Sequence, residues 1–155
     1  MVAHLSIAVV AEPIDLAAAT AELAAGRTDI GAVVTFTGLC RDEGGTLEAL
    51  ELEHYPGMAE AEITRIAESA AARFDVDTIA VRHRYGKVRP GEVIVLVATA
   101  SKHRQAAFEA ASFIMDFLKT HAPFWKKEHK ATGPSGWVAA KSSDDDAEAR
   151  WKNPI

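Results

Sequence analysis

Residues 93–100 constrain the fold more than any other segment, because every residue in this run except Thr99 is apolar. A strand with one wet face alternates between apolar and polar residues, whereas a strand buried on both faces is apolar throughout. We therefore expect this segment to be a central strand of a sheet. Residues 101–120 then carry an apolar stripe at helical spacing. This pattern predicts a helix that Ser101 caps and that Pro123 prevents from continuing.

The rest of the chain mixes strands and helices. Strands are predicted at residues 4–11, 31–38, 47–55 and 78–85, with a final hairpin formed by residues 124–130 and 136–140. Helices are predicted from Asp15 to about residue 25, at residues 59–74 and, as a short tail helix, at residues 144–151. Several neighbouring strands are joined by short turns, so antiparallel pairs are expected. The predicted fold class is α+β rather than a doubly wound parallel sheet.

The composition is typical of a globular protein with one domain. The 155 residues are 48% hydrophobic and 25% charged, which is enough to bury a core, and we treat residues 1–155 as a single domain. No apolar run approaches the ~20 residues that span a membrane. The N-terminus lacks the basic and apolar regions of a secretory signal. We expect a cytoplasmic protein with no membrane association.

Charge and cysteine usage exclude further classes. The net charge of −5 gives no support to nucleic-acid binding, but basic residues gather locally, which favours a small anionic ligand. Cys40 is the single cysteine, so neither an internal disulfide nor a cysteine-cluster metal site is expected. No histidine pair with a carboxylate indicates a metal either. Cys40 has no assignable base, and we expect its thiol to be inert.

The long predicted helix has a basic first turn formed by Lys102, His103 and Arg104. Cations at a helix N-terminus oppose the helix dipole, while the free backbone N–H groups there attract anions. The turn is therefore either a site for phosphate or carboxylate, or an exposed basic turn paired with surface acids. The residues alone leave both interpretations open.

Lys119 stands at the other end of the same helix, on one stripe with Phe108 and Met115. An amine at the edge of an apolar stripe is partly desolvated, which suits proton transfer or nucleophilic attack. The simpler alternative is a lysine whose stem covers its apolar neighbours. Further along, Lys126 and Lys127 fall on opposite faces of a predicted strand. One of these two lysines can therefore share a site with Lys119.

Helix length separates the two candidate regions. His103 and Lys119 are 16 residues apart, which is ~24 Å at about 1.5 Å per residue. One small ligand cannot contact both ends of one helix. Either the chain has two sites, or two copies of the chain assemble one site across a symmetric interface.

The chain also carries a series of ordered motifs. They are Gly-Ala-Val-Val-Thr-Phe-Thr-Gly at 31–38, Arg41, Leu-Glu-His-Tyr-Pro-Gly-Met at 52–58, His-Arg-Tyr-Gly at 83–86, Pro-Gly-Glu at 90–92, Ser-Lys-His-Arg at 101–104, the run 108–120, Ala-Pro-Phe-Trp-Lys at 122–126 and Trp-Val at 137–138. Together these motifs resemble the molybdopterin synthase catalytic (large) subunit family, over residues 30–151.

The resemblance implies a fold, a reaction and partners. It implies an α/β hammerhead-like domain with a small antiparallel β subdomain, and a homodimer within a heterotetramer. It implies a sulfurtransferase of molybdenum cofactor biosynthesis that needs no metal or other cofactor. The sulfur comes from the C-terminal Gly-Gly thiocarboxylate of a small ubiquitin-like carrier subunit. The acceptor is cyclic pyranopterin monophosphate, which becomes the dithiolene of molybdopterin.

The resemblance also implies which residues form the site. Lys119 and Lys126 are the implied catalytic residues. The implied substrate-binding residues are Leu39, Cys40, Arg41, His103, Arg104, Lys119, Lys126, Lys127 and Glu128, and the implied pocket lining is Phe36, Met115 and Lys141. His103 and Arg104 are implied to reach the site from the neighbouring subunit, in agreement with the helix-length argument.

Two residues depart from the family pattern, and two other functions compete with it. Leu39 stands where the family often has a lysine, and Lys141 stands where an arginine is common, which removes bidentate phosphate binding.

A non-catalytic paralogue that binds the carrier or an anion is the main alternative. The intact set of Arg41, His103, Arg104 and the two lysines argues against it. A phosphate-ester hydrolase is disfavoured because no nucleophile–base pair is evident.

Overall fold

The computed structural model describes residues 3–131, 133–138 and 142–152, which form two sheets and four helices. The first sheet contains β1 (His4–Val10), β4 (Thr78–Arg84), β6 (Val93–Ser101) and β2 (Ala32–Leu39), in that order. The second contains β5 (Gly86–Val88), β3 (Leu47–Glu53), β7 (Trp125–Lys130) and β8 (Gly133–Trp137). The helices are α1 (Leu16–Glu22), α2 (Met58–Arg73), α3 (Arg104–His121) and α4 (Ser142–Ala149).

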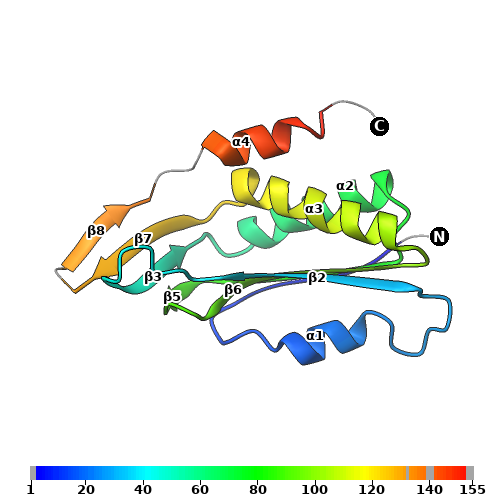
Figure 1. The fold of residues 1–155 in the computed structure, drawn as a ribbon, viewed down its shortest axis with the longest axis horizontal. Coiled ribbons are helices and arrows are strands. Elements are labelled where there is room, and N and C mark those ends of the chain that lie inside the picture. The colour runs from blue at the N-terminus through cyan, green and yellow to red at the C-terminus, as the bar shows by residue number, and fades with distance from the viewer. Residues whose placement is uncertain (1–2, 132, 139–141, 153–155) are drawn as a thin grey trace.

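The strand order explains why residues 93–100 are apolar throughout. Strand β6 lies between β4 and β2 and pairs antiparallel with both. Helices α2 and α3 lie on one side of this sheet and α1 on the other (Figure 1), so both faces of β6 are covered. Strands β1 and β4 form the parallel pair of the first sheet, whereas every pair in the second sheet is antiparallel. The predicted α+β class with a small antiparallel sheet is confirmed.

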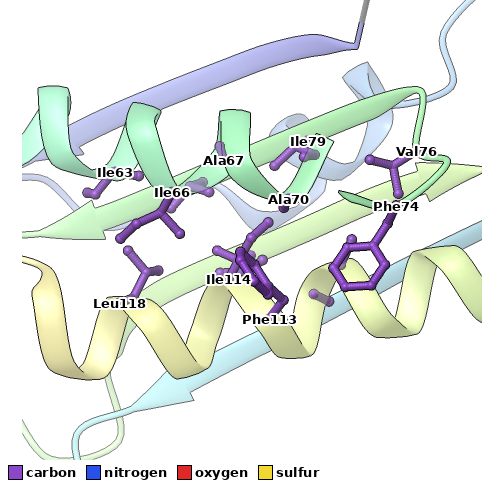
Figure 2. Close-up of a cluster of buried hydrophobic side chains, with 14 of the residues drawn as sticks. Ile63, Ile66, Ala67, Ala70, Phe74, Val76, Ile79, Phe113, Ile114 and Leu118 are labelled. Atoms are coloured by element: carbon purple, nitrogen blue, oxygen red, sulfur yellow. The ribbon is translucent and has the colours of Figure 1, made fainter. Parts of the chain in front are cut away.

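The main core lies between the two long helices and the first sheet. Ile63 and Ile66 of α2 meet Ile114 and Leu118 of α3 (Figure 2), and three of these four side chains are at most 1% exposed. Burying one such side chain stabilises the fold by about 1.5–3 kcal/mol. Because α3 is anchored along its length by this packing, the side chains on its other faces have fixed positions.

The start of α3 differs from the prediction. The helix begins at Arg104 with His103 as its N-cap, and no side chain caps it. Ser101 instead ends β6, where it pairs with Ala32 of β2 and donates its hydroxyl to the Asp75 carbonyl at 2.7 Å. The expectation that Ser101 caps the helix was wrong, because strand pairing extends one residue further than the apolar run. The first backbone N–H groups of α3 consequently stay without a side-chain partner.

Other element bounds also shift. Strand β5 was missed because it has three residues, and it begins at Gly86, whose φ of +83° permits the tight turn after β4. Helix α1 ends at Glu22 rather than near residue 25. The second strand of the hairpin is β8, three residues earlier than expected, since Lys130 pairs directly with Gly133 across a short turn. The predicted tail helix is confirmed as α4. In the described part of the chain, no helix has the length and apolarity to cross a membrane.

Candidate active site

A cavity of about 390 Å³ lies between the C-terminal half of α3, the first sheet and the start of β7. Five of the predicted site residues line it: Phe36 and Leu39 from β2, Met115 and Lys119 from α3, and Lys126 from β7. The remaining walls are mostly apolar, with Ile94, Val95, Leu118 and Phe124 among them. These five residues come from three elements that are separate in sequence, and the fold brings them to one cavity.

Local geometry explains how each lysine reaches the cavity. Met115 and Lys119 are one helical turn apart, so they project from the same face of α3. In the second sheet, Lys126 pairs with the buried Leu52 of β3 and therefore faces inward. Lys119 is 42% exposed and lies 4.0 Å from Asp144 of α4. The amine is thus at the mouth of the cavity rather than deep within the core.

Lys127 and Glu128 follow Lys126 in β7 and lie on opposite faces of the strand. Lys127 is on the opposite face of β7, where its ammonium lies 5.9 Å from the centre of the Trp137 ring. Glu128 lies on the same face as Lys126 and forms an ion pair with Lys130 at 3.5 Å. Of the two lysines that could share a site with Lys119, the structure brings Lys126 to the same cavity, and the implied substrate-binding roles of Lys127 and Glu128 stay predictions. Neither Lys127 nor Glu128 lines the cavity.

The predicted site residues that follow β2 lie in different surroundings. Cys40 is 3% exposed and packs with Leu52 and Val88, and this burial raises the pKa of its thiol. An inert cysteine is what the sequence predicted. Arg41 is exposed, pairs with Glu43 and does not line the cavity. Lys141 lies outside the described residues, so its predicted role in the pocket stays a prediction.

His103 and Arg104 lie at the far end of α3, in a separate shallow hollow with Phe108. Phe108 is 59% exposed, so a large apolar side chain lies open to solvent beside these two basic residues. Within one chain this hollow and the cavity of Lys119 are distinct, as the helix length required.

His83 and Phe124 are cavity residues that the site prediction missed. The His83 ring stacks on Phe124 with centroids 3.8 Å apart and an angle of 11° between the planes. Its Nδ1 donates a hydrogen bond to the Arg84 carbonyl at 2.8 Å. Burial, together with the nearby charges of Lys126 and Lys119, lowers the pKa of His83 to about 4. The imidazole is therefore uncharged at neutral pH.

These features define the chemistry that the cavity offers. Two ammonium groups stand at a mostly apolar cavity that also contains the Asp116 carboxylate and one neutral imidazole. Among residues 3–131, 133–138 and 142–152, no group of three or more histidine, cysteine or acidic side chains is placed to hold a metal ion. The fold and site define an α+β protein with two lysines at a mostly apolar cavity, an arrangement whose charge suits an anionic ligand.

Comparisons with known proteins agree with this class. Residues 9–121 match the family described as MoaE protein. The chain is 61% identical over 152 residues to the molybdopterin synthase catalytic subunit of Rhizobium meliloti (strain 1021), covering 97% of this chain and 98% of that one. It is 64% identical over 140 residues to the protein of the same name from Mesorhizobium japonicum, covering 90% and 88% of the two chains.

Solved structures give the same result. The molybdopterin biosynthesis MoaE protein from Burkholderia ambifaria MC40-6 superposes with a TM-score of 0.83 at 44% identity, covering 96% of this chain and 99% of that one. A chain from the complex of subunits 1 and 2 of the molybdopterin-converting factor of Helicobacter pylori, 24% identical with a TM-score of 0.70, shares the fold. The chain belongs to the MoaE family of molybdopterin synthase catalytic subunits, which confirms the resemblance of its motifs.

Proposed function

We propose that this chain is the sulfur-transferring subunit of a molybdopterin synthase. In this proposal, the C-terminal Gly-Gly thiocarboxylate of a small ubiquitin-like carrier subunit enters the cavity. Its sulfur forms a new bond to carbon of cyclic pyranopterin monophosphate, while water takes the acyl group and leaves the carrier with a Gly-Gly carboxylate. Two such transfers complete the dithiolene. The observation that carries the proposal is that Lys119 and Lys126 line one mostly apolar cavity. The names of the relatives, which describe a catalytic subunit, support a second subunit as partner.

The side chains of the cavity suit a thiocarboxylate tail. The sulfur of the carrier is itself the nucleophile, so the protein needs no reactive cysteine, and the burial of Cys40 is consistent with this. Lys119 and Lys126 supply positive charge where the anionic tail ends and where negative charge develops during acyl transfer. Lys119 additionally transfers protons or holds the acyl group. Apolar walls lower the local dielectric constant and strengthen these electrostatic interactions.

We further propose that the complete site is assembled by two copies of the chain. His103 and Arg104 of one copy would bind the phosphate of the substrate beside Lys119 of the other. Three observations support this arrangement: the two regions are separate within one chain, Phe108 is exposed beside His103, and Val33, Phe36 and Leu39 are exposed on the edge strand β2. Apolar groups exposed near both regions are the kind that a homodimer interface covers.

The direct test is conversion of the pyranopterin precursor in vitro with a thiocarboxylated carrier. The wild-type chain is expected to form molybdopterin, and Lys119→Ala is expected to lose at least ~100-fold in rate, as removal of a charge-stabilising donor does. Lys87→Ala, which removes an exposed lysine of β5, serves as the matched control and should keep full activity. If wild type and Lys119→Ala are equally inactive while the carrier still binds, the chain is a non-catalytic carrier-binding paralogue.

A further inference from the structure

The proton of the His83 ring has a fixed position. A carbonyl oxygen can only accept a hydrogen bond, so the 2.8 Å contact between Nδ1 and the Arg84 carbonyl places the proton on Nδ1. In the neutral ring, Nε2 then carries a lone pair. Stacking against Phe124 fixes the plane of the ring. The direction in which Nε2 accepts a hydrogen bond is thereby set before any ligand arrives.

The lone pair of Nε2 faces the cavity. In the part of the chain that the structure describes, no group donates a hydrogen bond to Nε2. The one fully buried side-chain nitrogen or oxygen without a partner among those residues is Nε of Arg84, so Nε2 of His83 is not sealed from solvent. Because His83 is only 9% exposed and lines the cavity, the cavity is where solvent reaches it.

The other polar side chains of the cavity offer different chemistry. Lys119 and Lys126 are donors and cannot accept. Asp116 accepts from the Trp151 indole at 2.6 Å and from Arg150 at 2.7 Å, and its negative charge repels an anionic ligand. The remaining lining side chains are apolar, apart from the weakly accepting sulfur of Met115. His83 is thus the uncharged side-chain acceptor of this cavity.

A peptide tail that ends in a carboxylate or thiocarboxylate complements this arrangement. Its anionic end matches the two ammonium groups. Its backbone N–H groups need acceptors, since an amide drawn from water into an apolar cavity without a hydrogen bond is strongly disfavoured. A Gly-Gly segment has no side chains, so the cavity walls can approach its backbone closely. One neutral acceptor and two cations therefore match one amide donor and one anionic terminus.

We propose that Nε2 of His83 accepts a hydrogen bond from a backbone N–H of the carrier's C-terminal Gly-Gly segment. This bond fixes how deeply the tail enters and how it is rotated, so that its terminal group meets Lys119 and Lys126. His83 is a positioning residue in this role, because it contacts the tail and not the reacting atoms. The inference rests on the proposed function, since it names a contact of the same carrier tail.

The test pairs variants of His83 with modified carriers. Affinity is measured by calorimetry between the full chain and a carrier ending in the unreactive Gly-Gly carboxylate, without pyranopterin. His83→Phe keeps a ring against Phe124 but has no acceptor, and it is expected to weaken binding about five- to tenfold. His83→Gln keeps an acceptor and should recover most of the affinity. In turnover, His83→Phe should raise the KM for the carrier more than it lowers kcat.

The matched ligand change is N-methylation of one glycine of the tail, which removes a single N–H. Methylation of the donating glycine should weaken wild-type binding to a similar degree and should have no further effect on His83→Phe. A tail with alanine at that glycine keeps the N–H and controls for the added methyl group. These carriers can be tested on the wild-type chain alone, so the inference stays testable if His83→Phe does not fold.

Three results would overturn the inference. The first is an unchanged carrier affinity of a folded His83→Phe. The second is that methylation of either glycine weakens binding to His83→Phe as much as it weakens binding to the wild-type chain. The third is an effect of His83→Phe on the KM of pyranopterin alone. The last result would mean that His83 binds the pterin substrate instead of the carrier tail. Failure of the proposed function is a different result, in which the wild-type chain neither binds the carrier nor converts the precursor.

Discussion

The ammonium of Lys119 lies 4.0 Å from a carboxylate oxygen of Asp144, so a lysine of the cavity is within ion-pair distance of helix α4. The same end of α3 also holds α4 in place. Glu148 of α4 accepts hydrogen bonds from the Thr120 hydroxyl at 2.5 Å and from the His121 ring at 2.6 Å. Helix α4 lies alongside α3 (Figure 1), its first turn is within reach of a cavity lysine, and its charge is opposite to that of the lysine.

Asp144→Asn is expected to tighten binding of a carboxylate-ended carrier about twofold. The anionic tail must replace Asp144 as the partner of Lys119, and a partly exposed pair at this distance contributes about 0.5 kcal/mol. Calorimetric titration of the two proteins measures the change. Asp145→Asn removes a neighbouring exposed charge of α4 and serves as the control, with no change in affinity expected. Equal effects of the two variants would show that the ion pair with Lys119 has no specific role.

Trp151→Ala is expected to lower the free energy of unfolding by about 2–3 kcal/mol. The indole packs edge-on against Phe74 and Phe113, with ring centres 5.7 and 5.5 Å away, and donates from Nε1 to Asp116. Its loss removes contacts that join the C-terminal segment to the main core. Urea unfolding measures the change, and Trp137→Ala, which removes a 56% exposed indole, should cost less than half as much. Similar losses in the two variants would contradict this account.

The sequence predicts the parts of the site that lie on one element. Met115 and Lys119 are four residues apart on a helix whose apolar stripe is clear, so their shared face was predictable. The inward direction of Lys126 was only partly predictable, because the alternation of side chains along a strand allowed either Lys126 or Lys127 to reach the site. Pairing of β7 with β3 decided between them, because Lys126 lies beside the buried Leu52.

His83 was not predictable from its strand. Alternation assigns a face only where one side of a strand is wet, and every residue of β4 except Arg82 is buried. Its role depends on Phe124, which is distant in sequence and meets His83 only when the two sheets come together. The Ser101 error has a similar origin, since antiparallel pairing with β2 extended β6 into the expected helix cap. In both cases a tertiary contact decides what a local pattern leaves open.

Acidification is expected to destabilise the wild-type chain more than His83→Gln. The pKa of His83 is lowered to about 4 in the folded chain, whereas the unfolded chain binds a proton near pH 6.5. Between these values the unfolded state holds the additional proton, so this contribution to stability falls as the pH drops from 6.5 toward 4, by up to ~3 kcal/mol. Urea unfolding at pH 7 and pH 4.5 measures the loss.

The glutamine variant separates His83 from other acid-sensitive groups. The pKa values of Glu51 and Glu148 are lowered by their hydrogen bonds to His129 and to Thr120, so both proteins also lose stability as these carboxylates protonate. Only the difference between the two proteins reports on His83. The same pH-dependent loss in both would mean that the buried ring does not resist protonation.

Gly31→Ala is expected to destabilise the chain by about 2–3 kcal/mol and to weaken substrate binding at His103. A Cβ at this position would lie 2.2 Å from the backbone carbonyl oxygen of Lys102, so the turn between β6 and α3 must move. Thermal unfolding and the KM for pyranopterin measure the two effects. Gly44→Ala, whose added carbon meets nothing nearer than 3.6 Å, is the control and should change neither quantity appreciably. A normal KM for pyranopterin in the folded variant would show that the position of this turn does not affect substrate binding.

Mixing two inactive variants is expected to restore activity if the site is shared between two copies. Lys119→Ala keeps His103 and Arg104, whereas the double variant His103→Ala, Arg104→Ala keeps Lys119. In a mixed dimer, Lys119 of one chain then faces the intact basic turn of the other, and one of the two sites is complete. Random exchange makes half of the dimers mixed, so recovery should reach about a quarter of the wild-type rate.

The mixing experiment also distinguishes the two arrangements that helix length allows. If each chain carried a complete and independent site, both variants would stay inactive at every mixing ratio. If His103 and Arg104 had no role in turnover, the double variant would be active before mixing. A mixture of Lys119→Ala with Lys126→Ala is the matched control, because both lysines line the same cavity of one chain. No mixed dimer can then contain a complete site, so the control mixture should remain inactive.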